Sequence, residues 1–327
     1  MANPFSKPLA PSGASGSLSP DDRAPVRRLR GIVTALITPL TADYQLDKAA
    51  LEGLLAHQID AGIHGIFVLG SVGEGPLLTE EMSAEVARRS VDLVDGRCPV
   101  LGGAIDNSVE RCLRRLNALA EAGVDMGVLT LPCYGWPHRL AESIAFFSEV
   151  AARSPLPVMA YDLPKVVGWQ MPLELIEALF EIENLVGLKC THADAPAMVA
   201  ACSSPKRPEG FAFLPGNSSL VLPMLRAGAD GLVCTPSNVF PEPFVALFRA
   251  FEEKRFEEAE ALAENVLPRL VELLGILPNG AGSIKAVLEV QGLARRFTAP
   301  PWPQASEEEM DSARQILKNI NQAISNS

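Results

Sequence analysis

Lys189 carries the clearest chemical signal in this sequence. It follows the apolar run 185–188 (LVGL), a pattern that predicts a buried strand ending at the lysine. An ammonium in that place is partly removed from water, which lowers its pKa and leaves an amine able to attack a carbonyl carbon as a Schiff-base nucleophile. A lysine can also lie there with its head group extended to solvent. The position alone leaves both interpretations open.

Tyr161 and Ser71 could support such a nucleophile by moving protons. Tyr161 ends another apolar run, 157–161, and a phenol beside Lys189 can act as a general acid or base. Ser71 lies in a loop between two glycines, where a flexible backbone can turn N–H groups toward a carboxylate. Tyrosines at strand ends and Ser-Gly loops also occur without any chemistry. Both residues are therefore candidates in combination with Lys189.

The sequence contains none of the motifs considered for nucleotide or metal binding. The loop 70–75 (GSVGEG) is neither GxGxxG nor a phosphate-binding loop ending in Gly-Lys-Ser/Thr. The histidines lack the HxxxH or HxH spacing of a metal-dependent aldolase; they are His57, His64, His138 and His192. The cysteines form no CxxC pair, so reduced thiols are expected; they are Cys98, Cys112, Cys133, Cys190, Cys202 and Cys234. We expect no metal and no cofactor, and we interpret His57 and His64 as packing or surface residues.

Composition argues against whole classes of function. The chain has 327 residues with 28 Lys+Arg against 39 Asp+Glu, a net charge of −11, and its longest basic run is the short stretch 27–30. A nucleic-acid partner is therefore not expected. The sequence has no apolar window long enough for a membrane span and no secretory signal, so we expect a cytoplasmic protein without a membrane partner. At 48% hydrophobic residues, the chain can bury a large core.

The order of apolar runs predicts a (β/α)8 TIM barrel, which is an α/β fold. Predicted strands cover 31–37, 65–69, 99–103, 125–129, 157–161, 185–189, 211–214 and 230–233. Predicted helices cover 47–61, 79–94, 108–122, 139–153, 172–181, 192–203, 218–227 and 241–253. Strands each followed by a helix are typical of that barrel, and uniformly apolar strands suit a parallel sheet covered by helices. An open doubly wound sheet is the alternative.

We divide the chain into three parts. A disordered N-terminal tail, 1–29, is rich in Pro, Ser, Gly and Ala. A catalytic barrel follows at 30–253, and a C-terminal helical region at 254–327 contains three helices predicted at 255–275, 283–291 and 306–324. Active sites of such barrels lie at the carboxyl ends of the strands. The segments expected to meet at that mouth are 70–74, 133–136, 161–164, 187–189 and 215–217.

Taken in order, these segments resemble a known family, the class I aldolases related to dihydrodipicolinate synthase and N-acetylneuraminate lyase. The resemblance is carried by 31–39 (GIVTALITP), 70–74 (GSVGE), 161–164 (YDLP), 187–189 (GLK), 215–217 (PGN), 228–231 (GADG) and 284–286 (IKA). It implies a (β/α)8 barrel with C-terminal helices, usually assembled as a homotetramer built from two dimers. It also implies a lyase that acts on pyruvate or another small 2-oxo acid through a Schiff base.

The resemblance also implies a role for each candidate. Lys189 would form the imine, Tyr161 would be the general acid and base, and Ser71 would relay protons between Tyr161 and Tyr134. Tyr134 would come from the neighbouring subunit of a dimer. The substrate would be lined by Val72, Gly216, Asn217, Val233 and Val166. Specificity for the second substrate would come from the rim segments 136–138, 166–169 and 217–219.

Two positions depart from the family pattern. Val72 stands where the family's glycine loop commonly carries a second hydroxyl, so a carboxylate there must rely on Ser71 and backbone N–H groups. Val166 stands where dihydrodipicolinate synthases carry an arginine that binds the second substrate's carboxylate. Valine cannot do this, which disfavours true dihydrodipicolinate synthase activity. Lys285, on the C-terminal helices, is interpreted as a non-catalytic lysine whose replacement by Ala should cause a far smaller loss than Lys189→Ala.

Three functions remain after these departures. The first is cleavage or formation of a carbon–carbon bond in a 2-oxo acid, such as pyruvate, a 2-keto-3-deoxy acid or a 4-hydroxy-2-oxo acid. The second is a dihydrodipicolinate synthase-like condensation, or a dehydration, on the same imine. The third is a catalytically weak family member kept for binding or regulation. The joint presence of Lys189, Tyr161, Tyr134 and Ser71 favours an enzyme.

Overall fold

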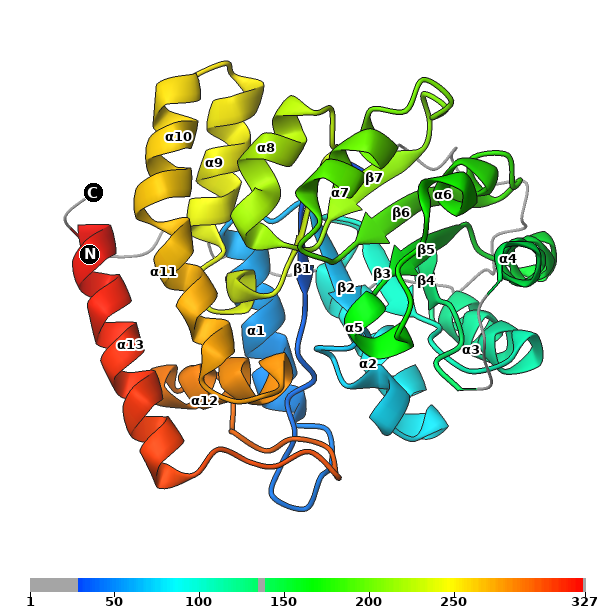
Figure 1. Ribbon diagram of the computed structural model, residues 1–327. Coiled ribbons are helices and arrows are strands. Elements are labelled where there is room, and N and C mark those ends of the chain that lie inside the picture. The colour runs from blue at the N-terminus through cyan, green and yellow to red at the C-terminus, as the bar shows by residue number, and fades with distance from the viewer. Residues whose placement is uncertain (1–28, 135–138, 326–327) are drawn as a thin grey trace, which may run out of the picture.

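Parallel strands form the centre of the molecule in the computed structural model, which describes residues 29–134 and 139–325 (Figure 1). Within those residues the barrel strands are β1 (Gly31–Ala35), β2 (Gly65–Val68), β3 (Val100–Gly103), β4 (Met126–Thr130), β5 (Val158–Asp162), β6 (Leu185–Cys190), β7 (Ala212–Pro215) and β8 (Gly231–Cys234). Each predicted strand is present, with its ends moved by two residues or fewer. Most of the predicted N-terminal tail and the rim segment 136–138 lie outside the described residues.

The strands close into a barrel rather than an open sheet. Each strand from β1 to β6 pairs in parallel with the next one along the chain, and β8 returns to pair with β1. β7 and β8 meet through Asp230, whose N–H donates to the Phe213 carbonyl (2.9 Å) and whose carboxylate accepts from the Phe213 N–H (2.8 Å). This sequential order confirms the TIM barrel and excludes the doubly wound alternative, whose strand order reverses at a switch point.

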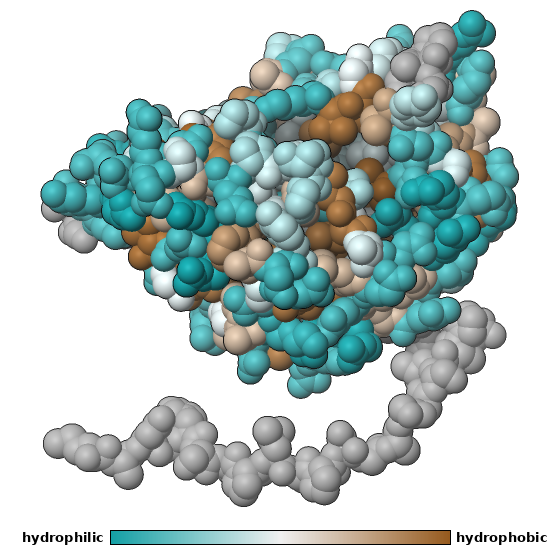
Figure 2. Space-filling model, turned by 90° about the horizontal axis from the view of Figure 1, so that it is seen from below, coloured by the Kyte–Doolittle hydropathy of each residue, from teal (hydrophilic) through white to brown (hydrophobic). Residues whose placement is uncertain are grey.

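The carboxyl ends of the strands lie toward the bottom of Figure 1, so Figure 2 faces that end of the barrel. Apolar side chains gather near the middle of this face and hydrophilic ones surround them (Figure 2). Because active sites of this fold lie at the carboxyl ends, this is the face on which the candidate residues should meet.

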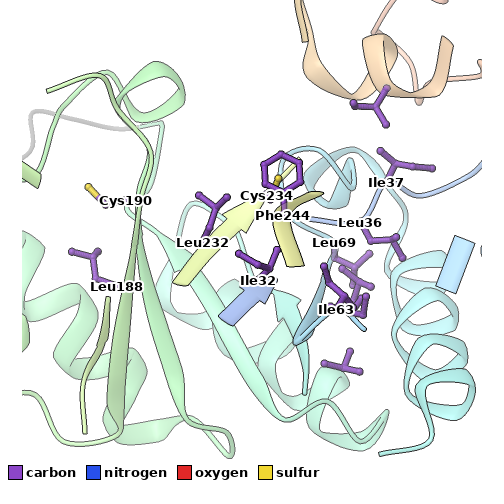
Figure 3. Packing of buried hydrophobic residues seen from close by; sticks show 14 of the residues in the cluster. Ile32, Leu36, Ile37, Ile63, Leu69, Leu188, Cys190, Leu232, Cys234 and Phe244 are labelled. Carbon is purple, nitrogen blue, oxygen red and sulfur yellow. The ribbon is translucent and has the colours of Figure 1, made fainter. Parts of the chain in front are cut away.

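Side chains along each strand alternate between the barrel interior and the surrounding helices, as strand geometry requires. The interior cluster includes Val33, Phe67, Leu101, Val128, Met159, Tyr161, Leu214 and Val233. Residues of opposite parity pack outward, as Figure 3 shows for Ile32 of β1 and for Leu232 and Cys234 of β8. Leu188 and Cys190 belong to the outward cluster. Lys189, which lies between them, therefore points into the barrel.

The helices cover the outside of the barrel. They are α1 (Lys48–Asp60), α2 (Glu80–Val94), α3 (Val109–Glu121), α4 (Leu140–Arg153), α5 (Pro164–Val167), α6 (Leu173–Leu179), α7 (Ala195–Cys202), α8 (Val221–Arg226) and α9 (Glu242–Glu252), with short 3-10 turns η2 (Gly75–Leu77), η3 (Ser218–Leu220) and η4 (Pro236–Asn238). Thr79 and Ser108 begin α2 and α3 as expected, because each hydroxyl accepts a backbone N–H of the first turn. The four-residue α5 was not predicted, since it is too short to show a helical period.

The C-terminal helical region differs from its prediction in two places. The single helix predicted at 255–275 is three elements, α10 (Phe256–Asn265), α11 (Leu267–Glu272) and η5 (Leu273–Gly275). Pro268 explains the break, because it has no N–H to donate within a continuous helix. The next helix, α12 (Gly280–Gln291), begins three residues early, since the Asn279 side chain caps it by accepting from the Gly282 N–H. The last is α13 (Glu307–Ser325).

These helices share the barrel's apolar core. Ala259, Leu270, Ile284 and Leu317 belong to the same buried cluster as the outward residues of the strands. The boundary we drew at residue 253 remains a prediction. Within the described residues no single helix is long and apolar enough to cross a membrane; Phe256–Gly275 and α12 pass that test together, but with a bend of 106°.

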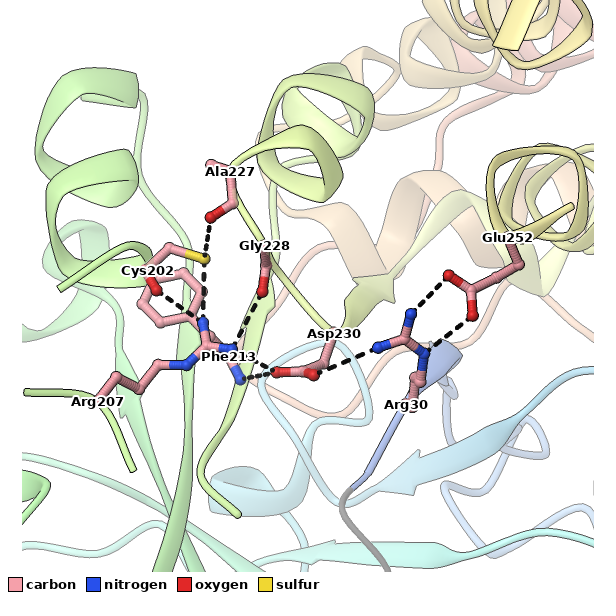
Figure 4. Close-up of polar contacts among 8 residues, drawn as sticks. All are labelled: Arg30, Cys202, Arg207, Phe213, Ala227, Gly228, Asp230 and Glu252. Carbon is pink, nitrogen blue, oxygen red and sulfur yellow. Dashed lines mark hydrogen bonds and ion pairs between the residues drawn. The ribbon is translucent and has the colours of Figure 1, made fainter. Parts of the chain in front are cut away.

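A charged network ties the opposite end of the barrel together (Figure 4). The Asp230 carboxylate, 1% exposed, lies 3.3 Å from an Arg207 Nη and 3.8 Å from an Arg30 Nη. Arg30 also pairs with Glu252 of α9, and Arg207 donates to the Cys202 carbonyl of α7 at 2.8 Å. The network therefore joins β8 to two covering helices, far from the carboxyl ends of the strands.

Candidate active site

Lys189 and Tyr161 lie side by side inside the barrel. They are paired across β5 and β6, and the Lys189 Nζ lies 4.0 Å from the centre of the Tyr161 ring. The Phe67 ring of β2 lies 4.9 Å from the same Nζ. Lys189 is only 6% exposed, and burial lowers its pKa to about 7. Roughly half of the amine is then uncharged at neutral pH, which is the form that attacks carbonyl carbon.

Two hydroxyl groups interact with the phenol of Tyr161. Ser71, in the loop after β2, and Thr191, which follows β6, lie close enough to lower the pKa of this phenol, although the buried Thr191 Oγ1 makes no hydrogen bond of standard geometry with the described residues. Burial raises the pKa of Tyr161 to about 12, although the two hydroxyls act in the opposite direction. The phenol therefore stays protonated at neutral pH and can donate a proton to a neighbouring oxygen. Thr191 was not among the predicted site residues, because nothing in the sequence shows that it faces Tyr161.

The predicted lining residues approach Lys189 from β7 and β8. A Cβ atom added at Gly216 would lie 1.8 Å from the Thr191 Oγ1 and 3.2 Å from the Lys189 Cε. Only a glycine fits at that position. Val233 is in the interior cluster, and the Asn217 side chain contacts the carbonyl of His192 at 3.5 Å. Val72 is half-buried and packs on the outward core.

The loop that carries Ser71 is held by a buried ion pair. Glu74 adopts a left-handed backbone conformation with φ 57°, and its N–H donates to the Ser71 carbonyl at 3.2 Å. Its carboxylate pairs with the Lys285 ammonium of α12 and accepts from the Ala299 N–H at 2.8 Å. Both side chains are fully buried. Burial raises the pKa of Glu74 and lowers that of Lys285, while their mutual attraction opposes both shifts.

This burial bears on the expectation that replacing Lys285 by Ala costs far less than replacing Lys189, because it gives Lys285 a structural role. Removing the ammonium would leave the Glu74 carboxylate without its charged partner in the core, which costs about 3–5 kcal/mol. The Lys285 Nζ also donates to the Phe297 carbonyl at 2.8 Å. Lys285 therefore remains a structural lysine, but one on which the site loop depends.

Tyr134 is the predicted site residue that the single chain does not bring inward. Its side chain is 82% exposed, although its N–H donates to the Asn107 Oδ1 at 3.0 Å. The exposure fits a residue that serves a neighbouring subunit, which the resemblance implied. Val166, on α5, is 52% exposed and lines a cavity of about 240 Å³ that reaches Ser71.

The structure also forms a cluster that the sequence did not reveal. Asp162, Cys190 and His192 lie outside the barrel wall behind Tyr161 and Lys189, with the Cys190 Sγ 3.1 Å and the Asp162 Oδ2 3.4 Å from the His192 Nε2. Three such groups could hold a metal ion. However, the Asp194 N–H donates to the His192 Nδ1 at 3.2 Å, so the ring proton is on Nε2. Burial also raises the pKa of Cys190 well above its usual value.

In this arrangement a metal ion would have to displace the Nε2 proton of His192 and the thiol proton of Cys190, because a ligating imidazole needs a free lone pair and a ligating cysteine must lose its proton. The Nε2–H instead donates toward the Asp162 carboxylate and the Cys190 sulfur. His57 and His64 are packing residues as predicted: His57 contacts the Val239 carbonyl and His64 accepts the Ile32 N–H. His138 lies outside the described residues.

Sequence comparisons relate the chain to one family of proteins. Residues 28–320 match the Dihydrodipicolinate synthetase family. A 4-hydroxy-tetrahydrodipicolinate synthase of Methanoculleus marisnigri is 29% identical over 291 residues, covering 88% of this chain and 98% of the relative. An uncharacterised DapA-like lyase of Halobacterium salinarum is 34% identical over 266 residues, covering 81% and 85%.

Solved structures described as members of the same family superpose on this chain. A chain described as the first monomeric dihydrodipicolinate synthase variant superposes with a TM-score of 0.85 at 26% identity, covering 90% of this chain and 98% of that one. YagE, a prophage protein of the dihydrodipicolinic acid synthase family from E. coli K12, was solved in complex with pyruvate. It superposes with a TM-score of 0.82 at 26% identity, covering 89% and 98%.

Proposed function

The chain belongs to the dihydrodipicolinate synthetase family of class I Schiff-base lyases, and from this premise we propose that Lys189 is the residue that forms the Schiff base with a 2-oxo acid. The observation that carries the proposal is the buried Lys189 amine, with its pKa of about 7, beside the Tyr161 phenol at the carboxyl end of the barrel. A buried amine with a depressed pKa and a neighbouring proton donor is the arrangement that imine formation needs.

The proposed sequence of steps uses few groups. The Lys189 amine attacks the carbonyl carbon of the 2-oxo acid, and the resulting carbinolamine loses its hydroxyl as water after Tyr161 donates a proton. The Tyr161 phenolate left by that step takes the proton of the substrate's 4-hydroxyl group, the bond between C3 and C4 breaks, and its electron pair passes to the protonated imine, giving an enamine and an aldehyde in the cleavage direction. Ser71, whose hydroxyl interacts with the Tyr161 phenol, is the proposed relay for these protons.

The 2-oxo acid end of the substrate would lie against backbone groups near Lys189. We place a small pyruvyl group between the loop around Ser71 and Val72 and the backbone at Gly216, where even an added Cβ would come within 3.2 Å of the Lys189 Cε. We retain aldol cleavage or condensation as the reaction class, with dihydrodipicolinate synthase-like condensation or dehydration on the same imine as the alternative. Val166 in place of the family's arginine, together with Val72, is the observation that favours a weakly catalytic binding role.

Assembly and location remain part of the proposal. The exposed Tyr134 supports a dimer in which it completes the partner's site, and two such dimers would form a homotetramer. A net charge of −11 and free cysteines are consistent with a cytoplasmic protein.

Borohydride trapping tests the proposal. Treating the protein with pyruvate and borohydride should add one reduced pyruvyl group to the Lys189 peptide, as measured by mass spectrometry. Lys189→Ala should abolish both trapping and turnover with the fold intact. Lys165→Ala, an exposed lysine on α5, is the matched control and should change neither. Normal trapping in Lys189→Ala would show that another amine forms the imine.

A further inference from the structure

A cluster of polar side chains lies directly behind Tyr161 and Lys189. Asp162 and Cys190 are the next residues along β5 and β6, and the two strands place them opposite each other. Because successive side chains of a strand point to opposite faces, these two point away from the barrel interior. His192 joins them there, with its Nε2 3.1 Å from the Cys190 Sγ and 3.4 Å from the Asp162 Oδ2. The proposed function uses none of these three groups.

Thr191 lies between Cys190 and His192 in the sequence but faces the other way. Its hydroxyl is close enough to the Tyr161 phenol to lower the pKa of that phenol, against the larger upward effect of burial. On its other side, a Cβ atom added at Gly216 would lie 1.8 Å from the Thr191 Oγ1. The hydroxyl makes no hydrogen bond of standard geometry with the described residues. Its place in this narrow space is therefore set by the main chain that carries it.

The His192 ring holds the main chain just after Thr191. β6 ends at Cys190, and the Thr191 N–H makes one further bond, to the Asp162 carbonyl at 2.9 Å. The ring provides the next attachment. Its Nδ1 accepts the N–H of Asp194, which caps α7, at 3.2 Å, and the proton on Nε2 therefore lies toward the Asp162 carboxylate. The ring connects the segment after Thr191 to β5 on one side and to α7 on the other.

The contact between His192 and Asp162 is shielded from water. Their side chains are only 8% and 1% exposed. The Asp162 carboxylate also accepts from the Met171 N–H at 3.2 Å, and the Cys190 Sγ lies 3.7 Å from it. A buried carboxylate that loses a donor must find another one or give up its charge. Removing the His192 N–H would therefore favour a shift of the segment after β6.

We propose that His192 is a positioning residue for imine formation. Through its contact with Asp162 it fixes the main chain at Thr191, whose hydroxyl then stays beside the Tyr161 phenol. This inference rests on the proposed function of Lys189. His192 touches no substrate and moves no proton; it acts on the step in which Tyr161 donates a proton to the carbinolamine hydroxyl, which leaves as water. Misplacing a group at such a step by about 1 Å can slow a reaction by roughly a hundredfold.

Two amide side chains that replace different halves of the imidazole provide the test. The amide nitrogen of His192→Gln can reach the place of Nε2, whereas the shorter side chain of His192→Asn can replace only Nδ1. The rate of imine formation with pyruvate is measured by stopping the reaction with borohydride at increasing times and quantifying the modified Lys189 peptide by mass spectrometry. His192→Asn should lower the limiting rate by roughly tenfold, with little change in the half-saturating pyruvate concentration. His192→Gln should recover most of that rate.

A double-mutant cycle shows whether His192 acts through Thr191. If it does, Thr191→Val/His192→Asn should form the imine no more slowly than Thr191→Val alone, because the hydroxyl that His192 positions is already absent. His64→Asn is the matched control. His64 is also a half-buried histidine whose Nδ1 accepts a backbone N–H, that of Ile32 at the amino end of β1, and its variant should keep the native rate. All rates are measured well below the lowest melting temperature of the set, so that a loss of stability alone changes none of them.

Three results would overturn the inference. The first is a native limiting rate in His192→Asn, and the second is equal slowing in His192→Asn and His192→Gln, which would leave only the bulk of the ring as its contribution. The third is a double variant in which the two losses multiply. Trapping in the native protein separates the two proposals. If pyruvate is trapped on Lys189, only the positioning role is wrong, whereas failure of trapping would reject the Schiff-base function itself.

Discussion

In the proposed mechanism a single lysine removed from water sets the pH range in which the reaction can begin. Burial places the Lys189 pKa at about 7, so protonation below that value removes the nucleophile. We expect kcat/KM for the 2-oxo acid to rise with pH and to level off above about 7, because this parameter follows the free enzyme. A pH profile of pyruvate trapping measures it directly. A rise centred near pH 10 would mean that the amine is solvated in the free enzyme.

A substitution at Tyr161 tests the proposed proton transfers. Tyr161→Phe removes one hydroxyl and keeps the ring that packs against Lys189. The rate should fall by roughly 10²–10⁴-fold, the usual contribution of general acid–base catalysis, with little change in melting temperature. Thr191→Val should cause a smaller loss, because the phenol would keep its Ser71 partner. A Tyr161→Phe protein with near-normal turnover would assign proton transfer to Ser71 or to water.

Sequence reasoning predicted candidate residues that follow directly on apolar strands. Lys189 and Tyr161 are visible because a reactive group ends a buried run, and strand alternation then places both inside the barrel. Thr191 is not visible in this way. It faces Tyr161 only because the strands bring the two residues together, and a threonine after a strand is an ordinary pattern.

At the scale of elements, the loop after β2 depends on the C-terminal helices. Glu74 keeps a left-handed conformation that a non-glycine residue adopts at a cost of about 1–2 kcal/mol. Its contacts with Lys285 and Ala299 offset that cost, and its N–H holds the Ser71 carbonyl. α12 therefore contributes to the position of Ser71 although it lies outside the barrel.

Paired substitutions separate this positioning role from simple stability. Lys285→Met should lower the melting temperature strongly, because it leaves a buried carboxylate unpaired. Lys285→Met with Glu74→Gln should recover part of the melting temperature but keep a raised KM for pyruvate, since the loop is no longer held. The matched control is Arg207→Met, in the charged network at the opposite end of the barrel; it should lower the melting temperature alone. Recovery of KM together with stability in the double variant would leave the pair a stabilising role only.

Local sequence patterns predicted the strands of this fold, but they could not predict contacts between segments far apart along the chain. Short apolar runs at regular spacing specify strands because each is buried on both faces, and every predicted strand is present. The break at Pro268 and the cap at Asn279 follow local rules that the helical period conceals in a long apolar stretch. The Glu74–Lys285 pair spans 211 residues of sequence. Such a contact depends on how α12 packs, which no local pattern encodes.

At the scale of the whole molecule, the open question is which chain supplies Tyr134 to a given site. Its side chain is 82% exposed in the single chain, while Ser71 and Tyr161 lie buried or half-buried at the mouth of the barrel. In the proposed dimer, Tyr134 would reach the partner's Ser71.

Coexpression of two defective chains tests this arrangement. Tyr134→Phe retains the Lys189 amine, and Lys189→Ala retains the Tyr134 hydroxyl. If the tyrosine crosses the interface, a mixed dimer rebuilds one complete site, and random pairing of equal amounts should recover about one quarter of the native sites. Pyruvate release should then exceed that of either variant expressed alone, and light scattering should show the assembled species. If the tyrosine serves its own chain, mixing cannot unite the two groups, and the activity will equal the average of the separate variants.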